Sequence, residues 1–246
     1  MIKRIAINLI LLVICIQGYA DTYLIAIGVS DYCDDVNYRG VQDLRTAAQD
    51  AYSIADFYSN QGGNLHSILL IDTSATRGNI LRHMTDFYSQ AAEDDHIVLF
   101  MACHGARGGF QVHDSALFYN EIVSIMGQSK AHNKIMYIDA CLSGGMKKDG
   151  VSTTDRETLN QYSIMCFFSS RPNEFSFESP DLKNGIFTTF LIEGLQGKAD
   201  GNNDAIVTAR ELFLYVSPMV AKESDKMQHP QMWGHFDKQM PLAIIK

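Results

Sequence analysis

The chain has 246 residues, a hydrophobic content of 46% and a charged content of 20%. These values indicate one sizeable hydrophobic core and exclude a chain that is disordered throughout. The formal net charge is −8 and no basic patch stands out, which argues against nucleic acid as a partner.

The first twenty residues have the pattern of a secretory signal peptide. Lys3 and Arg4 precede an apolar stretch at 5–16, and the small residues within 18–20 supply a cleavage site. The alternatives are an uncleaved anchor, for which the stretch is short, and a lipoprotein signal ending at Cys15, which the pattern resembles less. We therefore expect an exported protein, periplasmic or secreted.

The expected mature domain covers residues 21–246. Removal of the signal peptide leaves 18 Lys and Arg residues against 28 Asp and Glu residues, a net charge of −10. An acidic surface of this kind suits basic substrates. No membrane span is expected after removal of the signal, and the oligomeric state is not indicated. Cys103 and Cys166 lie in apolar runs and are expected to be buried, whereas Cys33 is the one loop candidate for a disulfide.

Strand and helix patterns alternate along this domain, which predicts a mostly parallel sheet covered by helices on both faces. The glycine-rich stretch 105–114 is expected to form a loop or hairpin, and 142–160 shows almost no apolar periodicity. Thr76 is a candidate cap for the second helix. The expected strands are 22–29, 66–71, 96–102, 133–139, 162–168 and 242–245, and the expected helices are 41–59, 76–92, 185–195 and 208–220.

Two of the apolar strands end in reactive side chains. The strand 96–102 leads into His104 and Gly105, and the strand 133–139 leads through Ala140 into Cys141. Chemistry in an open α/β sheet collects at the carboxyl ends of such strands. The pattern therefore predicts a Cys–His pair at one edge of the sheet.

These motifs, in this order, resemble the caspase and metacaspase clan of cysteine peptidases. The form Asp-Ala-Cys-Leu-Ser-Gly at 139–144 is closer to metacaspases and their bacterial relatives than to true caspases. The resemblance implies a three-layer caspase-like α/β sandwich and a cysteine endopeptidase. It is carried by residues 23–29, Gln49-Asp50-Ala51, 72–76, His104-Gly105, 139–144, 185–189 and 229–234.

The resemblance also assigns catalytic roles. Cys141 is the expected nucleophile and His104 the expected general base and acid, in a dyad without an evident third member. The backbone N–H groups of Cys141 and Gly105 are the expected oxyanion donors. The turn at Gly144-Gly145 lets the backbone approach a substrate carbonyl. The alternative for Cys141 is a buried structural thiol.

Asp139 lies two residues before Cys141, so the two side chains are expected on the same face of the strand. A carboxylate there raises a thiol pKa, and it is therefore assigned to a substrate cation. In the metacaspase pattern this residue and one that matches Asp50 bind Arg or Lys before the scissile bond. Ala102 stands where metacaspases often have Ser, which leaves the choice between Arg and Lys open. The alternative for Asp50 is a solvated helix position.

A second polar stretch resembles a calcium-binding loop. Oxygen donors fall at Asp200, Asn202, Asp204, Thr208 and Glu211, at the spacing of such loops. However, the sixth position holds alanine where the loop prefers glycine. A polar turn with Thr208 as a helix cap is the favoured alternative. We expect no required cofactor, with calcium as the one candidate ligand.

The stretch after Cys141 carries two adjacent lysines. Lys147 and Lys148 lie in a polar, glycine-flanked segment of the kind in which proteolytic nicking concentrates, and Arg156 is a further candidate. An enzyme that cleaves after basic residues is expected to process itself there. A solvated lysine pair is the alternative.

The sequence thus predicts a cysteine endopeptidase that acts on protein or peptide substrates after Arg or Lys. One alternative is a clan relative that cleaves after Asn, as legumains do. The other is a catalytically weak binding or regulatory protein of the same fold.

Overall fold

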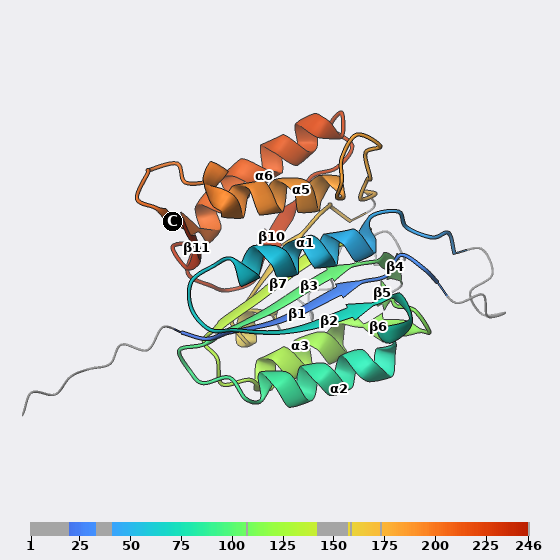
Figure 1. The fold of residues 1–246 in the computed structure, drawn as a ribbon, viewed down its shortest axis with the longest axis horizontal. Coiled ribbons are helices and arrows are strands. Elements are labelled where there is room, and N and C mark those ends of the chain that lie inside the picture. The colour runs from blue at the N-terminus through green and yellow to red at the C-terminus, as the bar shows by residue number, and fades with distance from the viewer. Residues whose placement is uncertain are drawn as a thin grey trace, which may run out of the picture.

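A computed structural model describes residues 20–32, 41–106, 108–141, 157, 159–172 and 174–245. Its middle layer is a six-stranded sheet with the order β10-β8-β7-β3-β1-β2 (Figure 1). Five neighbouring strands are parallel, and only β10 at one edge is antiparallel. The strands are β1 (Thr22–Gly28), β2 (Leu65–Ile71), β3 (His96–Ala102), β7 (Asn133–Asp139), β8 (Ile164–Phe168) and β10 (Gln231–Trp233).

Helices cover both faces of this sheet (Figure 1). Helices α1 (Ala47–Ser59), α5 (Ile186–Glu193) and α6 (Ala209–Glu223) lie on one face, and α2 (Arg77–Tyr88) and α3 (Tyr119–Gln128) lie on the other. Side chains alternate along each strand, so that Leu24 and Ala26 join one hydrophobic core and Ile25 and Ile27 join the other. The predicted fold class, a three-layer α/β sandwich with a mostly parallel sheet, is confirmed.

Two small antiparallel sheets and two short helical turns complete the described elements. The glycine-rich stretch after His104, predicted as a loop or hairpin, forms a three-stranded sheet. That sheet contains β4 (His104–Ala106), β5 (Gly109–Gln111) and β6 (Ala116–Phe118), while β9 (Ile206–Thr208) pairs with β11 (Pro241–Ile244). The turns are a 3-10 helix (Asp72–Ser74) and a π-helical turn (Gly194–Lys198).

The helix predicted from residue 41 begins only at Ala47. The N–H of Leu44 donates to the carbonyl of Ser30, and the N–H groups of Arg45 and Thr46 donate to the carboxylate of Glu178. These bonds pair the backbone of 44–46 with distant segments, and a helical periodicity in sequence does not reveal them.

Other boundaries also differ from the prediction. Thr76 caps α2 as predicted, by accepting a hydrogen bond from the N–H of Asn79, but the helix ends at Tyr88 and not at Ala92. Helix α3 and strand β10 were not predicted. Helix α3 buries Tyr119, Ile122, Val123 and Met126 at helical spacing, so the sequence carried a pattern for this helix that the prediction missed. Strand β10 is only three residues long and offers no periodic pattern.

Several predictions concern residues outside the described part. These are all but the last residue of the predicted signal peptide at 1–20, Cys33, and most of the stretch 142–160 with Lys147 and Lys148. Cys103 and Cys166 are buried free thiols, as predicted. Among the described helices, none has the length and apolar character to cross a membrane.

Candidate active site

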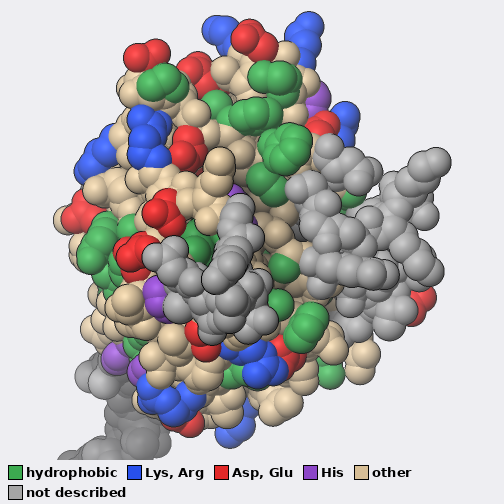
Figure 2. All heavy atoms as spheres, turned by 90° about the vertical axis from the view of Figure 1, so that its right-hand side faces the viewer, with side chains coloured by type: hydrophobic (Ala, Val, Ile, Leu, Met, Phe, Trp, Pro, Cys, Tyr) green, Lys and Arg blue, Asp and Glu red, His purple; other side chains and the backbone are tan. Residues whose placement is uncertain are grey.

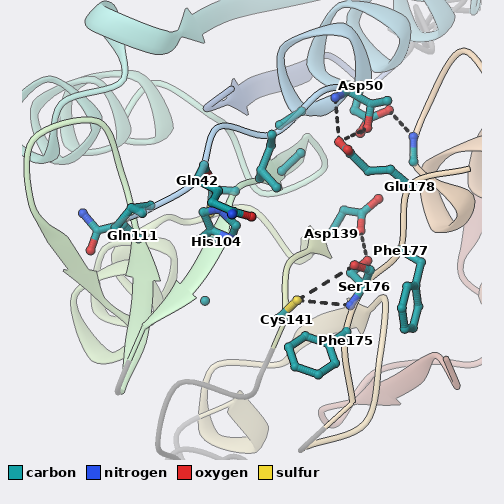
Figure 3. A pocket seen from close by; sticks show the side chains of 18 residues that line it. Gln42, Asp50, His104, Gln111, Asp139, Cys141, Phe175, Ser176, Phe177 and Glu178 are labelled. Atoms are coloured by element: carbon teal, nitrogen blue, oxygen red, sulfur yellow. Dashed lines mark hydrogen bonds between the residues drawn. The ribbon is translucent and has the colours of Figure 1, made fainter. Parts of the chain in front are cut away.

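A cavity of about 500 Å³ opens at the carboxyl ends of the parallel strands. Strands β3 and β7 deliver His104 and Cys141 to it, and helix α1 contributes Asp50 from one side (Figure 3). Residues 175–178, which follow β8, line the cavity from Cys141 to the start of α1, on the side away from His104. The structure thus brings together in one cavity the predicted residues Ala102, His104, Gly105, Cys141, Asp139 and Asp50.

Cys141 is partly buried and is oriented by Ser176. Its Sγ accepts a hydrogen bond of 3.1 Å from the backbone N–H of Ser176 (Figure 3). Burial raises the pKa of the Cys141 thiol, the Ser176 N–H opposes that rise, and the nearby charge of Asp139 adds to it. The thiol therefore needs a base to become a nucleophile at neutral pH.

His104 lies across the cavity from Cys141 (Figure 3). Its Nε2 is 2.7 Å from the backbone carbonyl oxygen of Gln42, and its backbone N–H donates to the hydroxyl of Tyr32 at 2.8 Å. The Tyr32 ring packs near the imidazole, with 5.1 Å between centroids. The Gln42 carbonyl thus fixes one ring nitrogen. Catalytic hydrogen bonds in unliganded enzymes often form only when substrate binds.

Gly105 lets the ends of the two active strands approach each other. A Cβ at this position would lie 1.6 Å from the carbonyl oxygen of Cys141, so no larger residue fits without moving the backbone. The backbone of Gly105 is therefore held beside that of Cys141. This is the placement expected for two oxyanion donors, whose role remains a prediction.

Asp139 is buried, with only 8% of its surface exposed, and points into the cavity on the same side as Cys141 (Figure 3). Its Oδ1 accepts a hydrogen bond from the hydroxyl of Ser176, and its Oδ2 accepts one of 2.7 Å from Thr188. Burial raises the pKa of Asp139, and these hydroxyls oppose the rise.

Asp50 is 2% exposed, so the alternative of a solvated helix position is wrong. Its Oδ1 accepts hydrogen bonds from Asn184 Nδ2 at 2.7 Å and from the Gly185 N–H at 3.0 Å. Its Oδ2 accepts one of 3.1 Å from the Thr46 hydroxyl. Burial raises the pKa of Asp50 well above its ordinary value, and repulsion from Asp139 raises it further.

Sequence reasoning missed a third carboxylate that lines the same cavity. Glu178 accepts hydrogen bonds from the N–H of Thr46 at 2.6 Å and from its hydroxyl at 2.8 Å. It also missed Ser176, Thr188 and the Gln42 carbonyl. Thr188 lies in the stretch 185–189 that carries the family resemblance, but no role was assigned to it, and the other groups lie on loops without a local pattern.

The segment 174–178 is anchored by Gln228, which is fully buried. Its Oε1 accepts from the N–H of Phe177 at 3.0 Å, and its Nε2 donates to the Ser169 carbonyl at 3.0 Å and to the Ser176 hydroxyl at 3.2 Å. Ser176 is therefore held from behind while it contacts Cys141 and Asp139.

The stretch from Asp200 to Glu211 forms a turn followed by a capped helix. Glu211 accepts hydrogen bonds from the N–H and hydroxyl of Thr208. Asp204 and Asp200 accept from backbone N–H groups within the turn. In the described part of the chain, no three His, Cys, Asp or Glu side chains gather closely enough to hold a metal ion. Calcium binding remains a prediction.

Comparisons with known proteins agree with this arrangement. The sequence model of the caspase domain matches residues 23–241. A structural-genomics protein from Geobacter sulfurreducens is 16% identical with a TM-score of 0.69, and the match covers 92% of this chain and all of the other. Caspase-1 from Spodoptera frugiperda is 14% identical with a TM-score of 0.66, and the match covers 93% and 92%. No curated protein matches the sequence.

The two solved structures are similar in fold, and the family match spans most of the sequence. A cysteine and a histidine lie at adjacent strand ends in the cavity of this chain. This chain belongs to the caspase-domain family of cysteine peptidases.

Proposed function

We propose that this protein is a cysteine endopeptidase that cleaves after Arg or Lys, with Cys141 as nucleophile and His104 as general base and acid. One observation carries the proposal. Two buried carboxylates, Asp50 and Asp139, line the same cavity as the Cys–His pair, and no Lys or Arg stands among the described residues that line it.

Two buried carboxylates without a cation are unfavourable for the fold. Burial of a charge costs free energy unless a partner compensates, and two neighbouring carboxylates also repel each other. Burial raises the pKa of both Asp50 and Asp139 for this reason, and repulsion from Asp139 raises that of Asp50 further. A substrate cation removes this cost, because it pairs with both groups when it enters the cavity. The planar fork of a guanidinium suits two carboxylates well.

The charge of the cavity wall supports a basic substrate. Figure 2 views the edge of the molecule on which the cavity lies, where Asp and Glu side chains lie among Lys and Arg side chains. Glu178 adds a third carboxylate to the cavity wall. The three carboxylates of the cavity wall therefore attract a cationic side chain.

The proposed chemistry proceeds through an acyl-enzyme. His104 takes the proton of the Cys141 thiol, and the sulfur attacks the substrate carbonyl carbon. The backbone N–H groups of Cys141 and Gly105 stabilise the oxyanion. His104 then donates its proton to the leaving amine, and a water molecule, deprotonated by His104, hydrolyses the thioester. The Gln42 carbonyl orients the imidazole throughout.

Two alternatives are tested by the same experiment. A preference for Asn would place a neutral amide between two carboxylates and leave their charge unpaired. A catalytically weak binding protein is the other alternative, because this family includes inactive members. The presence of both Cys141 and His104 in the cavity favours an enzyme.

The test uses fluorogenic peptides with Arg, Lys, Asn or Asp before the scissile bond, together with an Arg chloromethyl ketone that labels the nucleophile. Cys141→Ala should abolish cleavage and labelling, and His104→Ala should lower cleavage by a factor of about 10² or more, with the fold intact in both. Cys166→Ala is the matched control, since that buried thiol is not among the cavity residues. Wild-type cleavage after Asn alone, or none after any residue, would overturn the proposal.

The proposal extends to export and self-processing, which concern residues outside the described part. The chain leaves Cys141 directly into 142–156, the stretch that holds Lys147 and Lys148. A preference for basic residues, and a polar segment with two lysines directly after the nucleophile in sequence, support cleavage by the enzyme itself.

A further inference from the structure

Gly185 occupies the wall of the cavity between the two buried carboxylates. It precedes helix α5, and its N–H donates to Asp50 Oδ1. Its backbone angles, φ −54° and ψ 154°, are open to any L-amino acid. The conformation of the chain therefore does not require glycine here.

The space beside Gly185, unlike its backbone conformation, does restrict which residue fits here. A Cβ at this position would lie 3.0 Å from Asp139 Oδ2 and 3.2 Å from Asp50 Oδ2, with the Thr46 hydroxyl at 3.6 Å. Both Oδ2 atoms thus border the same gap, next to the bare Cα. A methyl group there would press on both carboxylates and cover the surface they share.

Gly28 and Gly234, in contrast to Gly185, pack against backbone. A Cβ at Gly28 would lie 2.3 Å from the Ala47 carbonyl oxygen, and one at Gly234 would lie 1.9 Å from that of Ile164. The neighbours of Gly185, in contrast, are three polar side-chain atoms that line the cavity. The absence of a side chain here is therefore linked to what the cavity binds.

We propose that Gly185 is a specificity-determining residue, because its missing side chain leaves Asp50 and Asp139 jointly accessible to one guanidinium. This inference rests on the proposed function. An arginine placed in the gap donates to both Oδ2 atoms from different nitrogens, as its planar fork allows. A lysine ammonium carries its three donors on a single nitrogen, so it must reach both carboxylates from one point. Gly185 therefore favours Arg over Lys.

The test compares Gly185→Ala with wild type by the rate at which Cys141 is alkylated. Iodoacetamide reports the thiol alone, and Arg and Lys chloromethyl ketones report the thiol and the cation site together. The variant should lose about tenfold to a hundredfold in the rate with the Arg ketone, the effect of one hydrogen bond between charged groups. Its rate with the Lys ketone should fall less, and its rate with iodoacetamide should stay within about twofold.

Gly78→Ala is the matched control, because a Cβ at Gly78 meets nothing within 4 Å. An equal loss with both ketones, or an unchanged Arg-to-Lys ratio, overturns the role of Gly185 while the peptidase proposal survives. A wild type that prefers neither cation over a neutral ketone overturns both.

A second measurement needs no variant. A wild-type enzyme should react about tenfold or more slowly with a ketone of asymmetric dimethylarginine, in which one nitrogen no longer donates, than with the Arg ketone. If Gly185→Ala fails to fold, equal wild-type rates with these two ketones overturn the inference.

Discussion

Asp139→Asn should change two properties of the site in opposite directions. Asp139 points into the cavity, where it is assigned to the substrate cation, and its charge also raises the pKa of the Cys141 thiol. Asparagine has nearly the same shape and still accepts a hydrogen bond from Ser176 or Thr188. The substitution therefore removes a charge with little change in packing.

The loss for cationic substrates follows from burial. Asp139 is 8% exposed, and removal of one partner of a desolvated ion pair costs about 2–5 kcal/mol. At about 1.4 kcal/mol for each tenfold change, kcat/KM for an Arg peptide should fall roughly 30- to 4,000-fold. We expect the lower half of this range for two reasons. Asp50 still provides one carboxylate, and the raised pKa of Asp139 means that its ionisation itself costs free energy, which offsets part of the gain from the ion pair.

The reactivity of the Cys141 thiol should increase in the same variant. Without the charge of Asp139, the pKa of Cys141 falls, although burial, the larger cause of its raised value, remains. The rate of alkylation by iodoacetamide at pH 7 should therefore rise, while the rate with the Arg ketone falls. Both rates are measured on one preparation by mass spectrometry of the intact protein. A parallel fall in both rates would refute this reasoning and assign Asp139 to the support of the nucleophile.

Two further predictions concern Asp50 and the stretch after Cys141. Because the pKa of Asp50 is raised in the folded state, its charge destabilises the fold increasingly as the pH rises from about 4 through that pKa. Asp50→Asn should therefore raise the Tm at neutral pH but leave it unchanged below about pH 4. The same substitution should weaken the binding of Arg ligands. A variant with a lower Tm than wild type at neutral pH would contradict this reasoning. Purified wild type should yield two fragments with a new N-terminus at Lys148 or Asp149, whereas Cys141→Ala stays intact, as N-terminal sequencing will show. An intact and fully active wild type would end the self-processing hypothesis.

The sequence predicts the central part of this fold well because its strands are continuous apolar runs. Strand β3 has the predicted bounds, as does β7, and both lead to their reactive residue. Five neighbouring strands are parallel, so this order alone places His104 and Cys141 at the same edge. The helix boundaries were less accurate, because Glu178 fixes the start of α1 from more than 130 residues away.

The walls of the site were not predictable in the same way. Ser176, Glu178 and Gln228 act through hydrogen bonds between segments that are distant in the sequence, and each is an ordinary polar residue in its local context. Asp50 was identified only through a family resemblance, since periodicity alone favours a solvated position for an acidic helix residue. Burial, which gives that carboxylate its significance, is a property of the assembled fold.

The cavity combines groups that are each unfavourable in the absence of substrate. Asp50 and Asp139 repel each other in a desolvated wall, and Asp139 also opposes ionisation of Cys141. Under the proposed function, entry of a substrate cation would neutralise the carboxylates. The same event would lower the pKa of the thiol, because it would remove the effect of the negative charge of Asp139. Binding of the correct side chain would therefore activate the nucleophile as well as position the scissile bond. A neutral side chain in the same cavity would neither neutralise the carboxylates nor lower the pKa of the thiol. A cationic substrate would therefore be favoured in kcat as well as in KM.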